Sequence, residues 1–379
     1  MSQHPISSIT AHFSSLEDPR VDRSKLHELR DILVIAICGV ICGADGWVGI
    51  ERFGNAKGDW LKSILDLPNG IPSHDTFGRV FARLDPEQFE RCFVNWVRAI
   101  FEVTEGEVVA VDGKTLRRSK DGTLGKDAIH MVSAWASENR LTLAQKKVDD
   151  KSNEITAIPA LLNLLELKGC IVTTDALGCQ TEIASTAVEG EGDYALPVKN
   201  NQKTLRQDIE SLFDYAHEED FEDVEHDFHR TVDGGHGRIE IRRTWTISDP
   251  EFFDWLDPHD RWEGLKSIGM VERERRADGK TEQETRYYIS SLSGEAEEFA
   301  HAVRSHWGIE NCVHWVLDIA FREDDSRVRK GHGAENLAIL RRLALNLLRQ
   351  ETTATCGTKN KRLKAAWDED YLLKVLGSA

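Results

Sequence analysis

The chain is predicted to fold as an α/β protein in which a small all-helical region precedes a mixed β-sheet. Three observations lead to this expectation. The first hundred residues carry apolar side chains at helical spacing, the spacing changes to that of strands from residue 107, and strands then alternate with helices. The order after residue 107 is β-β-β-α-β-α-β, which predicts a hairpin meander extended by parallel strands through right-handed crossovers.

The amino-terminal region is expected to consist of helices joined by tight turns. Residues 25–42 are largely apolar, which indicates a buried helix, and two glycines follow closely. Ser73 stands where it can cap a second helix, and Asp85-Pro86 separates that helix from a third over residues 87–101. Such a region can form a helix-turn-helix that reads DNA, or a plain helical cap domain, and the sequence leaves both readings open.

The sheet is expected to build up in a fixed order. A short apolar strand ends at Asp112, a hairpin follows, and a second buried strand ends at Asp175. The predicted elements are strands over 107–111, 129–136, 141–148, 170–174 and 193–199, and helices over 155–167 and 182–188. After a helix over residues 203–218, two further hairpins are predicted over 226–248 and 266–291, followed by long helices over 295–319 and 335–348. The segment 205–293 therefore reads as an inserted, β-rich subdomain.

The charge of the chain is unevenly distributed. The net charge is −17 over 379 residues, but residues 205–300 alone hold 26 acidic and 12 basic side chains. Basic runs lie outside this block, at 114–120, 327–330 and 359–364. Because a nucleic acid responds to the local field rather than to the total charge, the acidic total does not exclude DNA as a partner. Each basic run by itself is also compatible with an ordinary solvated surface.

Membrane insertion and a cysteine-based metal site are not expected. The longest apolar run, residues 32–43, is shorter than the roughly 20 residues needed to span a bilayer. The seven cysteines include no C-x-x-C pair, which argues against a zinc knuckle or a thioredoxin-type site. An odd number of scattered cysteines is typical of reduced thiols, so we expect a cytoplasmic protein without a membrane partner.

Two aspartates stand out because each follows a buried strand. Ligands of open α/β sheets gather at the carboxyl ends of the strands, and the predicted topology makes the strands before Asp112 and Asp175 neighbours. Two close carboxylates repel each other unless a cation lies between them, and Mg²⁺ or Mn²⁺ prefers such oxygen ligands. Each aspartate could instead simply cap a strand or loop.

The third candidate acid lies on the long helix over 295–319. Four ionisable side chains recur there every four residues and so share one face: His306, Glu310, His314 and Asp318. An exposed helix with His–Glu pairs, or zinc held by His306 and His314, are alternative readings, although no H-E-x-x-H motif is present. Trp307 and Trp315 on the neighbouring face are expected to belong to the core rather than to stack on bases. Three acids from two strands and a helix can hold two metal ions for phosphodiester chemistry.

Four motifs now carry a resemblance that covers nearly the whole chain. They are VDGKTLRRS around Asp112, VTTDALGCQ around Asp175, YALPVKNNQ from Tyr194, and RSHWGIENCVHWVLDIAFREDDSR around Glu310. With them the chain resembles insertion-sequence transposases of the H-repeat-associated type, which belong to the DDE superfamily and have an RNase-H-like catalytic core. The resemblance implies that Asp112, Asp175 and Glu310 form the catalytic, metal-binding triad and that Mg²⁺ or Mn²⁺ is the cofactor.

The resemblance also implies a division of the chain and a function. The expected parts are a helical domain over 1–102 that can bind DNA ends, the first part of the core over 103–204, the acidic insertion over 205–293, core helices over 294–350 and a tail over 351–379. The implied function is metal-dependent cleavage at inverted-repeat ends and strand transfer into target DNA. We expect a homo-oligomer on double-stranded DNA in the bacterial cytoplasm, associated with the nucleoid. A two-metal nuclease without strand transfer, and a non-catalytic DNA-binding remnant or regulator, are the alternatives.

Further residues are expected to support the triad. Predicted DNA contacts are Lys114, Arg117, Lys199, Arg304 and His306, and predicted neighbours of the metal ligands are Asn311, His314 and Asp318. One departure from related DDE transposases concerns the pattern Tyr-x2-Arg-x3-Glu-x6-Lys around the catalytic glutamate. The corresponding places here hold Val303, His306, Glu310 and Leu317. His306 would replace the arginine, and nothing replaces the lysine.

Overall fold

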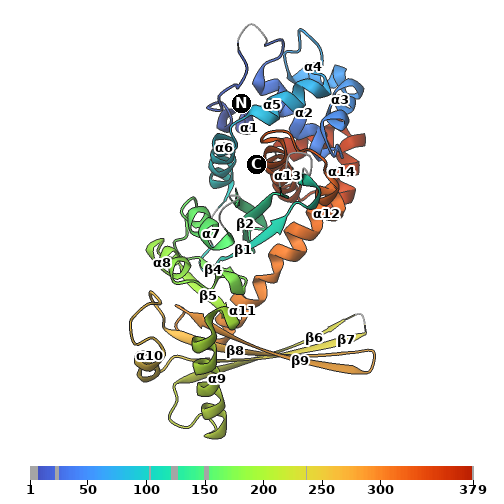
Figure 1. Ribbon diagram of the computed structural model, residues 1–379. Coiled ribbons are helices and arrows are strands. Elements are labelled where there is room, and N and C mark those ends of the chain that lie inside the picture. The colour runs from blue at the N-terminus through green and yellow to red at the C-terminus, as the bar shows by residue number, and fades with distance from the viewer. Residues whose placement is uncertain are drawn as a thin grey trace.

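A nine-stranded mixed sheet forms the centre of the molecule (Figure 1). The structure is a computed structural model that describes residues 7–21, 25–101, 104–120, 127–148, 153–235 and 237–377. The strand order is β3-β2-β1-β4-β5-β9-β8-β7-β6. Its first five strands are β1 (Val108–Thr115), β2 (His130–Ala136), β3 (Leu141–Lys147), β4 (Ile171–Thr174) and β5 (Asp193–Val198). The antiparallel meander extended by parallel strands is confirmed.

The parallel part of the sheet sets the position of the two aspartates. β1 pairs with β4 in parallel, with Val111 opposite Thr174, and the crossovers run through α7 (Glu154–Leu162) and α8 (Thr181–Glu189). The prediction that β1 ends before Asp112 is wrong, because the strand continues to Thr115. Its last residues no longer pair with β4 and are held by β2 alone, where Asp112 lies opposite Ser133.

The acidic segment contributes four strands to the same sheet. β6 (His226–Gly235) and β7 (Arg238–Ile247) form one predicted hairpin, and β8 (Ser267–Ala277) and β9 (Lys280–Ser290) form the other. β9 pairs with β5, so the sheet continues from the core into the segment without a break. The hairpins project to one side as a twisted ribbon, with α9 (Lys203–Glu218) and α10 (Pro250–Leu256) nearby (Figure 1).

Helices from both ends of the chain pack together beside the meander. In Figure 1 the blue amino-terminal helices and the red carboxy-terminal helices lie side by side. Helix α2 is buried along almost its whole length, as its apolar sequence predicts, and Arg362 from the other end donates a hydrogen bond to Val40 O over 2.8 Å. The predicted cap is confirmed, since Ser73 Oγ accepts a hydrogen bond from Thr76 N. These helices are α1 (Ser7–His12), α2 (Leu29–Ile41), α3 (Trp47–Ala56), α4 (Gly58–Ile64), α5 (His74–Arg83), α6 (Pro86–Ile100), α13 (Gly333–Gln350), α14 (Thr358–Trp367) and α15 (Glu369–Gly377).

The helix that carries Glu310 differs from its prediction. Residues 295–319 were expected to form one α-helix, but α11 (Ala296–Ser305) passes into a π-helical turn over Ile309–His314 before α12 (Trp315–Phe321) begins. Such turns are rare and frequently lie at functional sites. The side chains of Ile309, Val313, Leu317 and Phe321 are buried and occupy the core face.

The expectation that Trp307 and Trp315 belong to the core is wrong. Their side chains are 43% and 59% exposed. The physical reason is that the aliphatic residues of the same helix occupy the inward face, so that both indoles turn outward.

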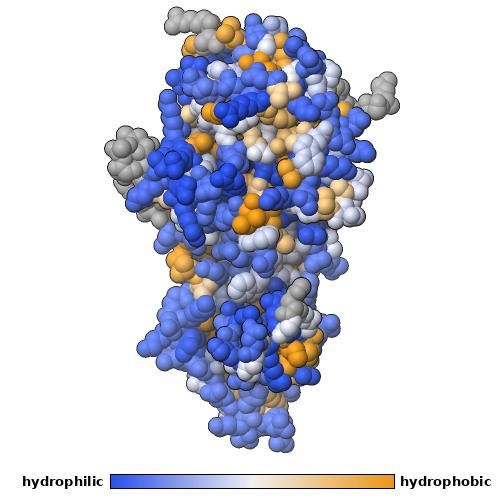
Figure 2. Space-filling model, turned by 90° about the vertical axis from the view of Figure 1, so that its right-hand side faces the viewer, coloured by the Kyte–Doolittle hydropathy of each residue, from blue (hydrophilic) through white to orange (hydrophobic). Residues whose placement is uncertain are grey.

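The surface is mostly polar on the side that Figure 2 displays, with separate apolar patches. In the part of the chain that the structure describes, no helix combines the length and the apolar character required to cross a bilayer.

Candidate active site

Asp112 and Asp175 extend from adjacent strands toward one cavity. They directly follow Val111 and Thr174, which are paired residues of the parallel strands β1 and β4. Both aspartates line a cavity of about 890 Å³, and Glu310 lines it from the helix above. The carboxylate of Asp175 also accepts hydrogen bonds from Leu177 N and Gly178 N, at 3.0 and 3.2 Å, which fixes its orientation. Side chains that lie 63 and 135 residues apart along the chain thus face the same space.

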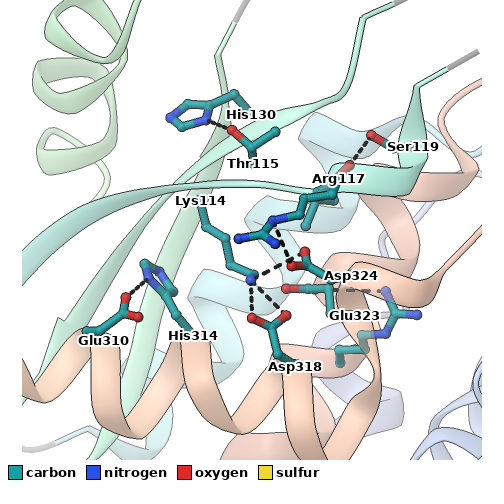
Figure 3. Close-up of polar contacts among 12 residues, drawn as sticks. Lys114, Thr115, Arg117, Ser119, His130, Glu310, His314, Asp318, Glu323 and Asp324 are labelled. Carbon is teal, nitrogen blue, oxygen red and sulfur yellow. Dashed lines mark hydrogen bonds and ion pairs between the residues drawn. The ribbon is translucent and has the colours of Figure 1, made fainter.

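Glu310 and Asp112 meet at the imidazole of His314. Nδ1 of His314 lies 3.1 Å from Glu310 Oε2 and 3.4 Å from Asp112 Oδ2, and Figure 3 displays the contact with Glu310. These three side chains can place their ligand atoms within 4.8 Å of one another. Asp175 lies outside this tightest set but lines the same cavity. His314 is buried, whereas the Glu310 side chain is 56% exposed, so the cluster opens to solvent on the Glu310 side.

The site disfavours negative charge on its most buried acid. Burial, together with the nearby carboxylates of Asp175, Glu154 and Glu310, raises the pKa of Asp112 to about 7, and a hydrogen bond from Gly113 N opposes the shift. Burial likewise raises the pKa of Asp175, an effect that Lys199 partly opposes. Burial lowers the pKa of His314 to about 3, so this imidazole is neutral at pH 7, with one ring nitrogen as a donor and the other able to accept or ligate.

The arrangement fits a divalent cation of the oxygen-preferring kind. Several carboxylates converge where no described lysine or arginine neutralises Asp112, and a cation would relieve their mutual repulsion. A zinc site built from both His306 and His314 is not supported. Nδ1 of His306 lies 3.2 Å from Thr173 Oγ1, and the possible ligand set found in the described residues includes His314 but not His306. Asp112, Asp175 and Glu310, with His314 beside them, are the residues that could hold such an ion.

Lys114 is not positioned as a free phosphate contact. Its side chain is 9% exposed, and Nζ lies 2.6 Å from Asp318 Oδ2 and 3.5 Å from Asp324 Oδ1 (Figure 3). Two carboxylates therefore already neutralise this ammonium. Asp318 is accordingly a partner of Lys114, and together they tie β1 to α12 directly beside Asp112.

A buried ion pair supports this region from behind. Glu323 and Arg342 are both fully buried, with Oε1 and Nη1 3.2 Å apart, and Arg342 Nε also donates to Ser133 Oγ on β2. Ser133 lies opposite Asp112 in the sheet. The pair thus connects α13 to the strand that holds the outer half of β1.

The remaining predicted DNA contacts fall in different places. Lys199 and His306 line the same cavity as the acids, and burial lowers the pKa of His306 to about 4, which leaves a neutral ring. Arg117 is 81% exposed and lies 3.2 Å from Asp324 Oδ2. Arg304 and Asn311 do not line this cavity but a separate groove, and the Asn311 side chain donates to Trp307 O.

Sequence reasoning missed Glu154 and His130. The carboxylate of Glu154 is hydrogen-bonded to Nε2 of His130, and both side chains pack against Gly113, next to Asp112. Glu154 also raises the pKa of both Asp112 and Asp175. Glu154 opens α7, where an acid is common because it favours the helix dipole, so nothing in the sequence distinguished it from an ordinary first-turn residue.

Comparison with known proteins gives consistent matches. The family described as "Transposase DDE domain" matches residues 104–347, and the family described as "DDE_Tnp_1-associated" matches residues 10–97. The chain is 43% identical to "Putative transposase YncI" of Escherichia coli O157:H7, over 98% of this chain and 95% of that protein. It is 42% identical to "H repeat-associated putative transposase YhhI" of Escherichia coli strain K12, over 97% of each chain.

The matches agree with the motifs that suggested the resemblance, and they extend over nearly the full length of these relatives. A family whose members carry a DDE domain acts on DNA and generally uses divalent metal ions, which suits the acidic cavity described above. The chain therefore belongs to the DDE transposase family, as an insertion-sequence transposase of the H-repeat-associated type.

Proposed function

We propose that this protein cleaves DNA at the inverted-repeat ends of its own mobile element and joins the freed 3′-hydroxyl to target DNA. The observation that carries the proposal is the convergence of Asp112, Asp175 and Glu310 on one cavity. Mg²⁺ or Mn²⁺ held by these carboxylates would supply activation of the attacking oxygen and stabilisation of the leaving oxygen.

The residues of the chain prepare this chemistry. Asp112 and Asp175 present oxygens from adjacent strands, and Glu310 presents a third from a helix, with its side chain half exposed. His314, neutral and buried, orients Glu310 and Asp112 through Nδ1. In place of the expected phosphate contact, we assign Lys114 as a positioning residue that fixes β1 through Asp318.

Contacts to DNA are proposed for the exposed cations around the cavity. Lys199 lines it directly and Arg117 lies exposed beyond Asp324, where both can pair with phosphates of the bound strand. We further propose that β1 to β5 with their crossover helices form the RNase-H-like core, that the helical region over 1–102 binds the element ends, and that a homo-oligomer holds paired ends.

The test is incubation of the purified protein with Mg²⁺ and DNA that carries the inverted repeats flanking its gene, with a supercoiled plasmid as target. Joined products are expected for the wild type, and neither cleaved nor joined DNA for Asp112→Asn, Asp175→Asn and Glu310→Gln. Hydrolysed ends without joining would identify a nuclease, and specific binding without cleavage would identify a DNA-binding remnant; either result overturns the proposal.

A further inference from the structure

A second groove lies between the β6–β9 ribbon and α11, adjoining the acidic cavity. Its volume is about 680 Å³, and one side is formed by the face of the ribbon and the other by the helix. Val303, Trp307, Glu284, Arg286 and Tyr288 line both hollows, so the groove continues directly from the acidic cavity. An extended ligand that occupies the cavity, such as a DNA strand, can therefore continue into this groove.

Arginines dominate the floor and rim of the groove. They are Arg238, Arg242, Arg273, Arg286 and Arg304. Arg242 and Arg273 lie directly opposite each other on β7 and β8, an arrangement that is unfavourable for like charges. Arg304 approaches them from α11, and burial together with the charges of Arg304 and Arg273 lowers the pKa of Arg242. The sheet thus concentrates positive charge within the most acidic segment of the chain.

The carboxylates of the groove neutralise only some of these arginines. Arg242 is paired with Asp233 at 2.8 Å and also with Glu240. The carboxylate of Glu284 forms ion pairs with both Arg273, at 3.1 Å, and Arg286, at 2.8 Å.

Two further arginines of the groove have no such partner. In the described ranges, no carboxylate pairs with Arg238 or Arg304, and both are exposed. Glu297, the remaining acid of the groove, forms no ion pair among the described residues either. Nε of Arg273 has no acceptor within the described structure. The groove therefore offers guanidinium donors that a polyanion would satisfy.

We propose that this groove is a second DNA-binding site, in which the guanidinium groups of Arg304, Arg273 and Arg238 hold the phosphodiester backbone of the DNA strand that enters the acidic cavity. The inference rests on the proposed function for the identity of the strand, but not for the chemistry of the site. Phosphate oxygens match the planar donors of arginine, and successive phosphates can follow the row of arginines away from the acids. The groove would thus fix the direction in which the DNA leaves the acidic cavity.

The chain offers a matched control for this site. Arg230 lies on β6 between His229 and Thr231, which both line the groove, so its side chain points to the opposite face of the ribbon. It is exposed, like Arg304. Arg304→Glu and Arg230→Glu therefore make the same charge change, the first on α11 inside the groove and the second on the face of the ribbon that points away from it.

The experiment measures binding of a fluorescein-labelled 30-base-pair duplex of arbitrary sequence, and of one of its single strands, by anisotropy in EDTA over a range of salt concentrations. Arg304→Glu is expected to raise Kd about tenfold in at least one of the two arms, because a charge-assisted contact is lost. The slope of log Kd against log salt should fall by about 1. Arg273→Gln should act in the same direction, and Arg230→Glu should leave both quantities near the wild-type values.

The outcomes separate this site from the proposed catalysis. If Arg304→Glu and Arg273→Gln bind both DNA forms as Arg230→Glu does, the groove is not a DNA site, whatever the wild type cleaves. Because the assay contains no metal ion, weakened binding in the groove variants supports the site even if the wild-type protein never cleaves DNA.

Discussion

Replacing Asp112 by asparagine is expected to stabilise the metal-free protein. Burial and the neighbouring carboxylates raise the pKa of Asp112 from 3.8 to about 7, while its side chain is only 24% exposed. One pKa unit corresponds to about 1.4 kcal/mol, so keeping Asp112 ionised in the folded chain costs about 4 kcal/mol. Asparagine removes this cost and keeps the size of the side chain. Ionised Asp112 therefore lowers the free energy of unfolding of the metal-free protein, a cost that is common for functional residues.

Because the pKa of Asp112 is higher in the folded chain than in the unfolded chain, its effect on the free energy of unfolding depends on pH. Below pH 3.8 the carboxyl group is protonated in both the folded and unfolded chain, so its ionisation costs nothing. The cost grows as pH rises from 3.8 to about 7 and is constant above that. The free energy of unfolding of Asp112→Asn should therefore exceed that of the wild type by about 1.5 kcal/mol at pH 5 and by up to about 4 kcal/mol at pH 8.

The measurement is urea unfolding in EDTA at the two pH values, with Asp254→Asn as the control. Asp254 is an exposed residue of α10, so the same chemical change there should leave stability nearly unaltered. Added Mg²⁺ should stabilise the wild type and narrow its deficit against Asp112→Asn. A variant less stable than the wild type at pH 8 in EDTA would refute the claim that the acids repel one another.

Two other perturbations test the surroundings of the site, and a third tests an ionised carboxylate among the carboxy-terminal helices. Lys114→Met should lower the free energy of unfolding, measured with urea, by about 2 kcal/mol because Asp318 loses its partner. Adding Asp318→Asn should restore most of this loss, and no recovery would exclude the proposed coupling between Lys114 and Asp318. Gly113→Ala should destabilise the fold by about 1–3 kcal/mol by thermal unfolding and reduce cleavage, because its Cβ would lie 2.5 Å from His130 Nε2; wild-type behaviour would contradict this crowding. Burial opposes ionisation of Glu351, but hydrogen bonds from Thr353 and Tyr371 outweigh this effect and lower the pKa of Glu351 to about 2. Ionised Glu351 therefore adds about 3 kcal/mol to the free energy of unfolding above pH 4.5, and this contribution is lost as the pH falls toward 2. Glu351→Gln should flatten this part of the acid-unfolding curve, and an unchanged curve would contradict the assignment.

The parts of the fold that follow a local pattern could be predicted from the sequence. Continuous or alternating apolar runs located the strands, and Asp278-Gly279 forms the predicted turn between β8 and β9, whereas Asp233 and Gly234 lie inside β6, opposite Glu240 and Ile239. Topology then brought Asp112 and Asp175 to adjacent strands. The joining of β9 to β5 was missed, because pairing between distant strands leaves no mark in the residues of either one.

The finer arrangement of the site could not be predicted because it depends on contacts between distant segments. A lysine next to a catalytic strand looks like a phosphate contact, and only the packing of α12 reveals that Lys114 is paired with Asp318. The spacing of ionisable residues on the helix was visible, but the π turn and the outward indole of Trp307 were not. Tertiary packing determines which face of that helix is buried, and this face cannot be predicted from local periodicity alone.

The proposed chemistry requires that Asp112, Asp175 and Glu310 share divalent cations. The most direct test is a titration of the full chain with Mn²⁺, followed by electron paramagnetic resonance, for the wild type and for Asp112→Asn, Asp175→Asn, Glu310→Gln and the distant Asp254→Asn. We expect bound Mn²⁺ in the wild type and in Asp254→Asn, displaced by excess Mg²⁺, and strongly weakened binding in the other three. Equal Mn²⁺ binding by all five proteins would contradict it.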